Sequence, residues 1–326
     1  MGLDACKYCF AAPVVVAMDL PLLGETEDPV APRLAAAASP WPGLLRVYRE
    51  MDDGELRFDI EAQTAATLGY TTNAFVAGPE ARWDEGMRLL VRLSQGELSS
   101  RTKEAVLAGA NRAAVEWAPG IWEVFQFRDA ELVGERLYAL TGLLRGVAGT
   151  EDAMAAGVLA EGARFVLLDG ASVALPMDLS ERGQMLNWRI GPTTKSPDSA
   201  SYASLSGTFE ARGLRPLSPV HVTGERSADR DIVIRWIRRT RIGGDDWDGV
   251  DVPLGEEKEA YALDLLHPVT GTLLRSVDVA APEWTYQEAD QIADLGTTSF
   301  DTLRLRVAQI SQSVGRGTAR ETMIHV

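Results

Sequence analysis

The stretch Leu214–Val252, LRPLSPVHVTGERSADRDIVIRWIRRTRIGGDDWDGVDV, decides the fold of the second half of the chain. It opens with a proline-bounded extended segment and a turn. Beyond the turn, Ile232, Ile234 and Trp236 alternate with other residues, so three large apolar side chains lie on one face of a strand. This pattern is typical of the first two strands of an antiparallel sandwich and not of an active-site loop. It predicts that the last third of the chain is a binding or spacer module.

Further strands follow at the spacing that a sandwich requires. Leu303, Leu305 and Val307 alternate with arginines, which predicts a strand with one buried and one solvated face. Residues 214–326 therefore predict a fibronectin-type-III-like β-sandwich. Its expected strands are Val220–Gly224, Asp231–Ile242, Glu259–Leu265, Leu273–Val279, Trp284–Tyr286, Thr302–Ile310 and Thr318–His325.

Residues 1–213 predict a loop-rich β domain, so the whole chain is expected to be mainly β. Alternating residues on either side of the turn Asp52-Asp53-Gly54 predict a hairpin over residues 44–60. The turn Asp169-Gly170 predicts a second hairpin over residues 165–176. Further strands are expected at Pro13–Leu20, Met87–Leu93, Trp122–Arg128, Arg136–Leu144 and Leu186–Ile190.

One short helix is expected in this first domain. Residues 101–111 (RTKEAVLAGAN) combine good helix formers, and Ser99 or Ser100 is the expected cap. Residues 24–43 hold an alanine run between prolines and glycines, which indicates either a long excursion or a short helix.

Two places are candidates for domain boundaries. Residues 192–213 are rich in Ser, Thr, Pro and Gly with little periodicity, so they predict a loop or linker and a boundary near residue 213. Gly78-Pro79 is a candidate hinge at which the first domain would split near residue 80.

The composition favours a globular protein that does not bind nucleic acid. The chain has 326 residues, 46% of them apolar, and a net charge of −15 from 32 basic and 47 acidic side chains. A phosphate backbone would be repelled by this charge, and the arginines near residue 238 are followed at once by aspartates. No 18-residue apolar span occurs, and the N-terminal apolar run lacks a basic start. Synthesis in a cytoplasm is expected.

No catalytic constellation is recognisable in the sequence. The chain has no G-x-S-x-G elbow, H-E-x-x-H, P-loop or G-x-G-x-x-G motif, and its three histidines offer little general-base material near pH 7. A glycosidase-like carboxylate pair is formally available, but with 47 acidic residues such pairs arise by chance. We therefore expect a protein that is not an enzyme, with no catalytic residues and no cofactor.

Metal binding has two weak candidates. Cys6 and Cys9 form a C-x-x-C, but zinc needs about four ligands and no further cysteine exists. Asp245, Asp246 and Asp248 offer oxygen ligands at the close spacing that suits Ca²⁺, without the spacing of a calcium-binding loop. Two reduced thiols and a solvated acidic loop are the favoured interpretations, so no metal is expected.

Three residues are candidates for contact with a partner. Trp247 is unusual in a solvated loop, which favours packing on the sandwich edge or contact with a partner. Trp122 lies in IWEVFQF, where both faces of the strand are apolar, so the segment is either core or an interface. Arg145, in LLRGVAG, is placed to clamp a carboxylate; an intramolecular acid or a loop carbonyl is an equally good partner.

Four long strings of the chain carry a resemblance to a known family: WEVFQFRDAELVGERLYALTGLLRGVAGTE (122–151), ARFVLLDGA (163–171), RGLRPLSPVHV (212–222) and IRWIRRTRIGGDDWDGVDVPLGEEKEAY (234–261). They resemble the C-terminal part of the large baseplate or tail-tip protein of gene transfer agents and related siphophages. The resemblance runs in order over most of the chain, roughly from Pro13 onward. The string Leu-Leu-Arg-Gly-x-x-Gly-Thr is similar to one found more broadly in tail-tip proteins.

This resemblance implies a structural component of a virion at the distal end of the tail, contributing to tail-end assembly and host attachment. Hub, distal tail and fibre proteins and the host surface would be its partners, and a homotrimer around the tail axis its assembly. The family's glycosidase-like N-terminal region has no counterpart here, and Leu303 stands where the sandwich pattern has Tyr. Eight Trp and the acidic pairs keep open an alternative, a carbohydrate-binding or glycan-hydrolysing module acting on the host envelope.

Overall fold

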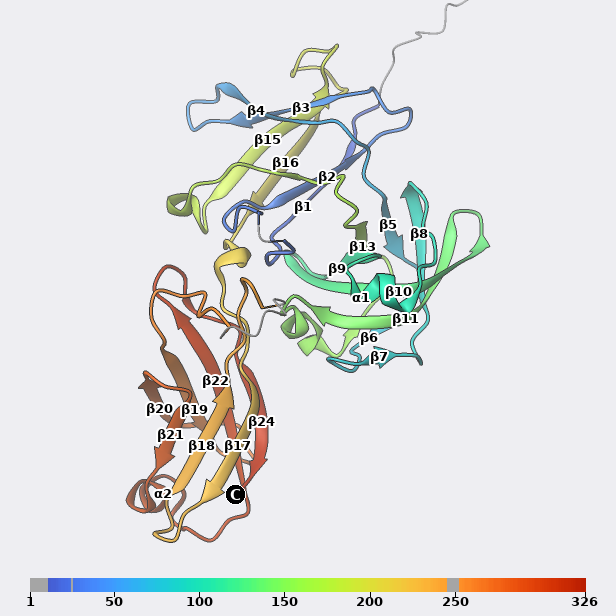
Figure 1. The fold of residues 1–326 in the computed structure, drawn as a ribbon. Helices are drawn as coiled ribbons and strands as arrows, with labels where there is room; N and C mark the ends of the chain where they lie inside the picture. Colours follow the sequence, from blue (N-terminus) through green and yellow to red (C-terminus); the bar gives the residue numbers. More distant parts are fainter. Residues whose placement is uncertain (1–10, 25, 245–251) are drawn as a thin grey trace, which may run out of the picture. The chain divides into compact units, whose positions relative to one another are not determined.

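A computed structural model describes residues 11–24, 26–244 and 252–326. Nearly all of its regular structure is antiparallel β-sheet (Figure 1), so the predicted mainly-β fold class is confirmed. The chain forms two compact units: Met1–Pro21 with Asp28–Arg212, and Leu22–Glu27 with Gly213–Val326. No helix in the described part of the chain is long and apolar enough to cross a membrane.

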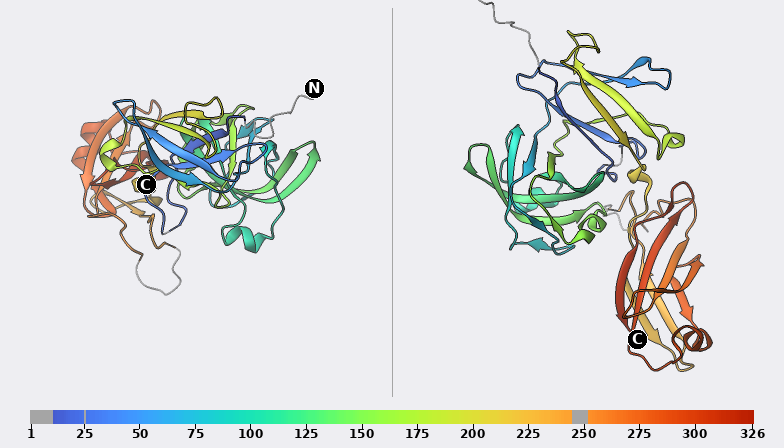
Figure 2. Two further views of the ribbon diagram at one scale, coloured as in Figure 1. Left: turned by 90° about the horizontal axis from the view of Figure 1, so that it is seen from above. Right: turned by 180° about the vertical axis from the view of Figure 1, so that it is seen from behind.

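The C-terminal unit is a sandwich of two sheets (Figure 2, right). One sheet has the order β17-β18-β21 and the other β20-β19-β22-β24, with the short β23 also paired to β22. Counting only the long strands, the first, second and fifth form one sheet, as in a fibronectin type III domain. The bounds are β17 Val220–Arg226, β18 Ile232–Ile237, β19 Tyr261–Leu266, β20 Leu273–Val279, β21 Glu283–Tyr286, β22 Thr302–Ser311, β23 Gly315–Arg316 and β24 Arg320–His325.

The two alternating patterns of the sequence form the core of this sandwich. Ile232, Ile234 and Trp236 are 0%, 0% and 4% exposed, and they pack against Leu305 of the opposite sheet within one cluster. The Trp236 ring meets Tyr261 edge-on, with centroids 5.2 Å apart. The period-two prediction for both strands is therefore confirmed.

A helix that the sequence reading missed, α2 (Glu288–Leu295), follows β21. It ends at Gly296, which is left-handed with φ 74° as helix C-termini favour. Gln291 is fully buried, and its Nε2 donates to the carbonyls of Tyr286 and Arg230. Few apolar residues in eight positions give too weak a periodicity to reveal the helix.

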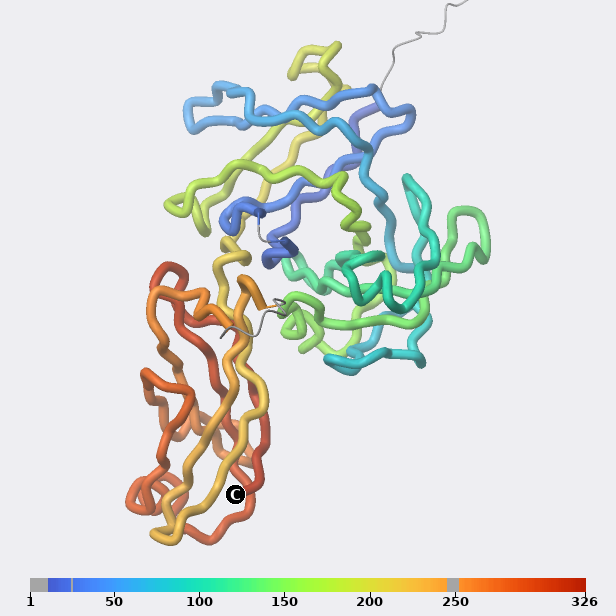
Figure 3. The backbone as a smooth tube through the Cα atoms, viewed as in Figure 1, coloured from blue at the N-terminus to red at the C-terminus, as the bar shows by residue number. Residues whose placement is uncertain are grey.

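The N-terminal unit contains two sheets built from both ends of its sequence. Their strand orders are β1-β2-β14 and β16-β15-β3-β4, the second called here the β15 sheet. Figure 3 shows the blue N-terminal strands alongside the yellow-green segment near residues 172–211. The bounds are β1 Val14–Met18, β2 Arg33–Ala37, β3 Leu45–Glu50, β4 Leu56–Ala62, β14 Val173–Ala174, β15 Met185–Pro192 and β16 Ala203–Thr208.

Two expectations for this region are wrong and one is confirmed. The alanine run in residues 24–43 forms strand β2, because it pairs with β1 and buries its alanines. Residues 192–213 are no plain linker, because β16 pairs along β15. The hairpin over residues 44–60 is present as β3 and β4.

A third sheet, called here the closed sheet, lies between these flanking segments in the sequence. Its strands pair in the order β10-β9-β13-β5-β8-β11, and it closes because β10 also pairs with β11. Leu167 N donates to Thr67 O at 3.0 Å, so the chain enters and leaves the closed sheet side by side. The bounds are β5 Leu68–Thr71, β8 Leu89–Gln95, β9 Arg112–Ala118, β10 Ile121–Gly134, β11 Leu137–Val147 and β13 Arg164–Leu167.

The closed sheet also corrects two local predictions. Residues 165–176 form no hairpin, because β13 pairs with β5 and β9 whereas β14 pairs with β2. The helix expected over residues 101–111 is shorter, α1 (Lys103–Leu107), and Thr102 caps it by accepting from Ala105 N. Short pairs β6–β12 and β7–β11 complete this region, with β6 Phe75–Val76, β7 Trp83–Asp84 and β12 Val158–Leu159.

Candidate interaction site and the buried charge network

Arg145 forms the centre of a buried ion pair inside the closed sheet. Its Nε donates to Glu123 Oε1 at 2.7 Å and its Nη2 to Glu123 Oε2 at 2.9 Å. Both side chains are 0% exposed. Of the partners considered from sequence, Arg145 therefore takes an intramolecular acid, in the bidentate geometry expected for a carboxylate.

The remaining polar atoms of this pair are also satisfied. Arg145 Nη1 donates to the Val76 carbonyl at 2.9 Å, and the guanidinium lies 3.6 Å above the Phe75 ring. Glu123 accepts further bonds from Trp117 Nε1 and from Gly146 N. A fully bonded, solvent-free pair of this kind fixes the geometry of the sheet and leaves Arg145 unavailable to a surface partner.

The rest of the Leu-Leu-Arg-Gly-x-x-Gly-Thr string is structural for identifiable reasons. Gly146 has φ 61°, and a Cβ there would lie 3.0 Å from the Glu151 backbone. Thr150 is fully buried, its Oγ1 accepts from Val124 N and donates to the Val147 carbonyl. Arg145, Gly146 and Thr150 of the string therefore each have a structural role in or beside the turn between β11 and the 3-10 helix that follows.

Trp122 belongs to the core. It is 4% exposed, and the Arg164 guanidinium lies 5.5 Å from its ring centroid. Phe125 and Phe127, on the opposite face of β10, are both fully buried in the interior of the closed sheet. Of the two interpretations of IWEVFQF, core and interface, the structure shows core.

The remaining residues that the sequence suggested for metal binding or partner contact lie outside the described residues. They are Trp247, the aspartates of its loop and the cysteine pair near the N-terminus. Across the part of the chain that the structure describes, no group of three or more His, Cys, Asp and Glu is placed to hold a metal ion. The residues concerned are Cys6, Cys9, Asp245, Asp246, Trp247 and Asp248.

A projecting hairpin was missed by the sequence reading. The part of β10 beyond its pairing with β9 continues along β11 as a hairpin (Figure 1), and Leu132 and Val133 near its turn are 61% and 39% exposed. Arg136 is left-handed, with φ 49°, and its carbonyl accepts from Leu93 N. Two exposed apolar side chains, on opposite faces of a hairpin whose turn is bonded to β8, form a candidate contact element. The signal was the run Leu132-Val133 beside Gly134, which lies between the strands expected at Trp122–Arg128 and Arg136–Leu144.

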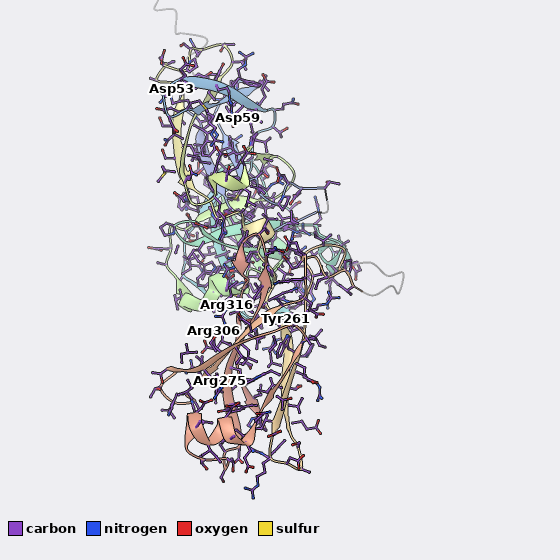
Figure 4. All side chains as sticks on the ribbon, turned by 90° about the vertical axis from the view of Figure 1, so that its left-hand side faces the viewer. Asp53, Asp59, Tyr261, Arg275, Arg306 and Arg316 are labelled. Carbon is purple, nitrogen blue, oxygen red and sulfur yellow. The ribbon has the colours of Figure 1, made fainter. Side chains whose placement is uncertain are left out.

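A second surface feature is a row of aromatic and polar side chains on the outward face of the β15 sheet. Strand register aligns Phe58, Tyr48, Arg189 and Ser204 across β4, β3, β15 and β16. Phe58 is 51% exposed. Figure 4 labels Asp53, at the turn of the β3–β4 hairpin, and Asp59 on β4.

Comparison with known families gives one match, to the family model described as Rcc01698-like, C-terminal, over residues 66–166. This family is associated with gene transfer agent proteins. The matched range begins just before β5 and ends within β13, so it coincides with the closed sheet and includes the Arg145–Glu123 pair and the projecting hairpin. No curated protein matches the chain.

Solved structures similar to the chain are multidomain fragments of animal proteins. Domains d3–d4 of rat CD45 share 9% identity, with 38% of this chain and 55% of that chain covered and a TM-score of 0.24. The FN1–FN3 domains of chicken CNTN1 share 13% identity, with 78% and 66% covered and a TM-score of 0.24. Titin domains A168–A170 share 9% identity, with 96% and 97% covered and a TM-score of 0.23. The sandwich assignment rests on the sheet topology described above.

Proposed function

We propose that this protein is a structural component of the tail tip of a phage-like particle, such as a gene transfer agent, and contributes to tail-end assembly and host attachment. The observation that carries the proposal is the family match over residues 66–166, which coincides with one closed structural element. The long strings that resemble tail-tip proteins, which extend beyond this range, support it as well.

The architecture suits such a role. The chain consists of rigid antiparallel β modules. Their buried charges are paired and hydrogen-bonded, as in Arg145 and Glu123. Rigid modules lose little conformational entropy when they bind their neighbours, and this favours stable contacts in an assembly. In this proposal the projecting hairpin, with Leu132 and Val133 at its tip, contacts a neighbouring tail protein, either the hub, the distal tail or fibre proteins or another copy in a trimer.

Immunogold labelling of intact particles with antibody against this chain tests the location. Gold at the distal end of the tail is the expected result. A blot of the same purified particles is run in parallel, because an inaccessible chain would be detected by the blot alone. Absence of the chain from purified particles by both measurements would overturn the proposal.

The hairpin contact has its own test. Leu132→Asp combined with Val133→Asp adds charge to an exposed tip, so the free protein should fold as before while its amount in purified particles falls at least tenfold. The matched control is Ile292→Asp, at a site on α2 that is 54% exposed. Equal incorporation of both variants would show that the tip makes no assembly contact.

A further inference from the structure

The outward row of the β15 sheet is rigid. The Tyr48 and Phe58 rings meet edge-on, with centroids 6.2 Å apart and planes at 77°. The Tyr202 ring lies beside Tyr48 on the same face, with centroids 6.3 Å apart, and Tyr202 is only 5% exposed. The space for its ring exists because residue 191 is glycine: a Cβ on Gly191 would lie 2.4 Å from the Tyr202 ring. The exposed Phe58 ring therefore packs against Tyr48, which Tyr202 in turn holds in place.

The polar members of the row are held in place too. Arg189 Nη1 donates to Ser204 Oγ at 2.6 Å, and Nη2 donates to the Pro197 carbonyl at 2.8 Å. Arg46 pairs with Glu61 on the same face, with Nε and Oε1 3.4 Å apart. Little side-chain entropy is lost when a ligand settles on groups that are already fixed.

A polar hollow of about 390 Å³ lies at the end of β3 and β15, and side chains from both faces of the sheet line it, with Arg49 and Leu186 from the inward face. Glu50 and Asn187 line it and lie opposite each other in register. They stand two residues along their strands from Tyr48 and Arg189, so they share the face of the aromatic row. Asn187 Oδ1 accepts from Ser206 Oγ, and its amide nitrogen has no partner among the described residues.

The charges of this surface favour a neutral ligand. Arg46 is matched by Glu61, and Arg49 at the hollow is matched by Glu181. Glu50 and Asp52 at the hollow form no ion pair among the described residues, whereas Arg189 in the row bonds only to neutral oxygens. The face therefore carries charges of both signs, with an acidic excess at the hollow that would repel a polyanion. A protein partner would need a larger apolar centre than one exposed ring.

We propose that this face binds a neutral polysaccharide chain. The apolar face of a sugar ring would stack on Phe58, while its hydroxyl groups donate to the Glu50 carboxylate and accept from the Asn187 amide. An exposed aromatic ring beside a concave set of polar groups suits a sugar, because the ring contacts its apolar face and the polar groups bond its hydroxyls. Host envelopes present such polymers, and binding is a property of the isolated chain whether or not it resides in a particle.

Affinity gel electrophoresis of the full chain tests this directly. The gels contain dextran, soluble galactomannan or hydroxyethyl cellulose as neutral polymers, and polygalacturonate as the anionic one. We expect retardation by at least one neutral polymer, and at least tenfold weaker binding for Phe58→Ala and for Glu50→Ala. The matched control is Tyr70→Ala, because Tyr70 is another exposed aromatic residue (40%) but lies on the closed sheet; its affinity should stay within twofold.

Thermal unfolding of each variant establishes that the fold is retained. Retardation in none of the neutral polymers overturns the proposal, as does retardation by polygalacturonate alone or an affinity that Phe58→Ala leaves unchanged. Failure here leaves the tail-tip location untouched, because that is decided by labelling and blotting of particles. Conversely, polysaccharide binding by a chain absent from particles would leave the site intact and remove the tail-tip function.

Discussion

At the scale of single residues, the buried pair of Arg145 and Glu123 makes the sharpest stability prediction. Arg145→Met leaves the Glu123 carboxylate buried without its counter-ion, so we expect a loss of about 3–5 kcal/mol in the free energy of unfolding. Urea unfolding followed by tryptophan fluorescence measures it, with Trp117 beside the pair as a reporter. Combining Arg145→Met with Glu123→Leu should recover much of the loss.

The control for this prediction is an exposed pair. Arg235 is 52% exposed and pairs with Glu283, so Arg235→Met should cost less than about 1 kcal/mol. If Arg145→Met cost as little as this control, the buried pair would contribute nothing to stability.

Glu321 links the stability of the sandwich to pH. Hydrogen bonds from Arg306 and then Arg304 hold the pKa of the Glu321 carboxyl below its usual value of 4.5. A pKa lowered by folding means that the ionised group stabilises the fold above pH 4.5, and that this contribution is lost as the pH falls through the lowered folded-state pKa. Figure 4 shows Arg306 labelled on the sandwich.

Glu321→Gln should therefore lower the free energy of unfolding at pH 7 by less than about 1 kcal/mol, since the three side chains are 33–42% exposed and screened by solvent. The difference from the unsubstituted protein should shrink below pH 4.5 and vanish once the pH lies well below the lowered folded-state pKa of Glu321. Chemical unfolding at a series of pH values checks this. A difference that is constant across the series would contradict the prediction.

At the scale of elements, the turn after β11 depends on Gly146. Gly146→Ala combines a left-handed φ of 61° with a Cβ 3.0 Å from the Glu151 backbone, so we expect a loss of about 2–4 kcal/mol. Gly170 is the matched control, because its φ is 89° but nothing lies within 4 Å of a Cβ there. Gly170→Ala should cost about 1–2 kcal/mol. Equal losses in thermal unfolding would show that backbone conformation alone matters.

Elements with a strong alternating pattern were predictable from sequence, and those without one were not. The sandwich strands around Ile234 and Leu305 are where the period of two placed them. Strand β2 was missed because alanines favour helices, and only its pairing with β1 makes it extended. The closing of one sheet through β10 and β11 depends on pairings between distant segments, which periodicity does not encode.

The candidate sites were predictable only in part. Arg145 was singled out correctly as a carboxylate partner, but its acid, Glu123, lies 22 residues away and was not identified. The row of Phe58 and Arg189 was invisible in the sequence, because it combines strands from both ends of the N-terminal unit. The row is created by the register of the paired strands, so no local sequence motif predicts it.

At the scale of the whole molecule, the sandwich should fold without the rest of the chain. The compact unit also includes Leu22–Glu27, but the buried core cluster of the sandwich, from Ile232 to Ile324, lies within residues 213–326. We expect the isolated segment 213–326 to unfold cooperatively on heating, followed by circular dichroism, and to give dispersed amide signals by NMR. A broad transition with collapsed signals would show that its stability depends on the N-terminal unit.

The neighbouring entry and exit of the closed sheet, at Thr67 and Leu167, have a consequence for synthesis on the ribosome. Strand β3 leaves the ribosome long before β15, its partner, whereas all strands of the closed sheet emerge between them. The inserted sheet can therefore reach its native pairings first, while β3 still lacks one neighbour. Because the closed sheet is joined to the flanking sheets by two adjacent segments, it could be exchanged during evolution for another domain whose ends are equally close. The flanking sheets would then keep their structure.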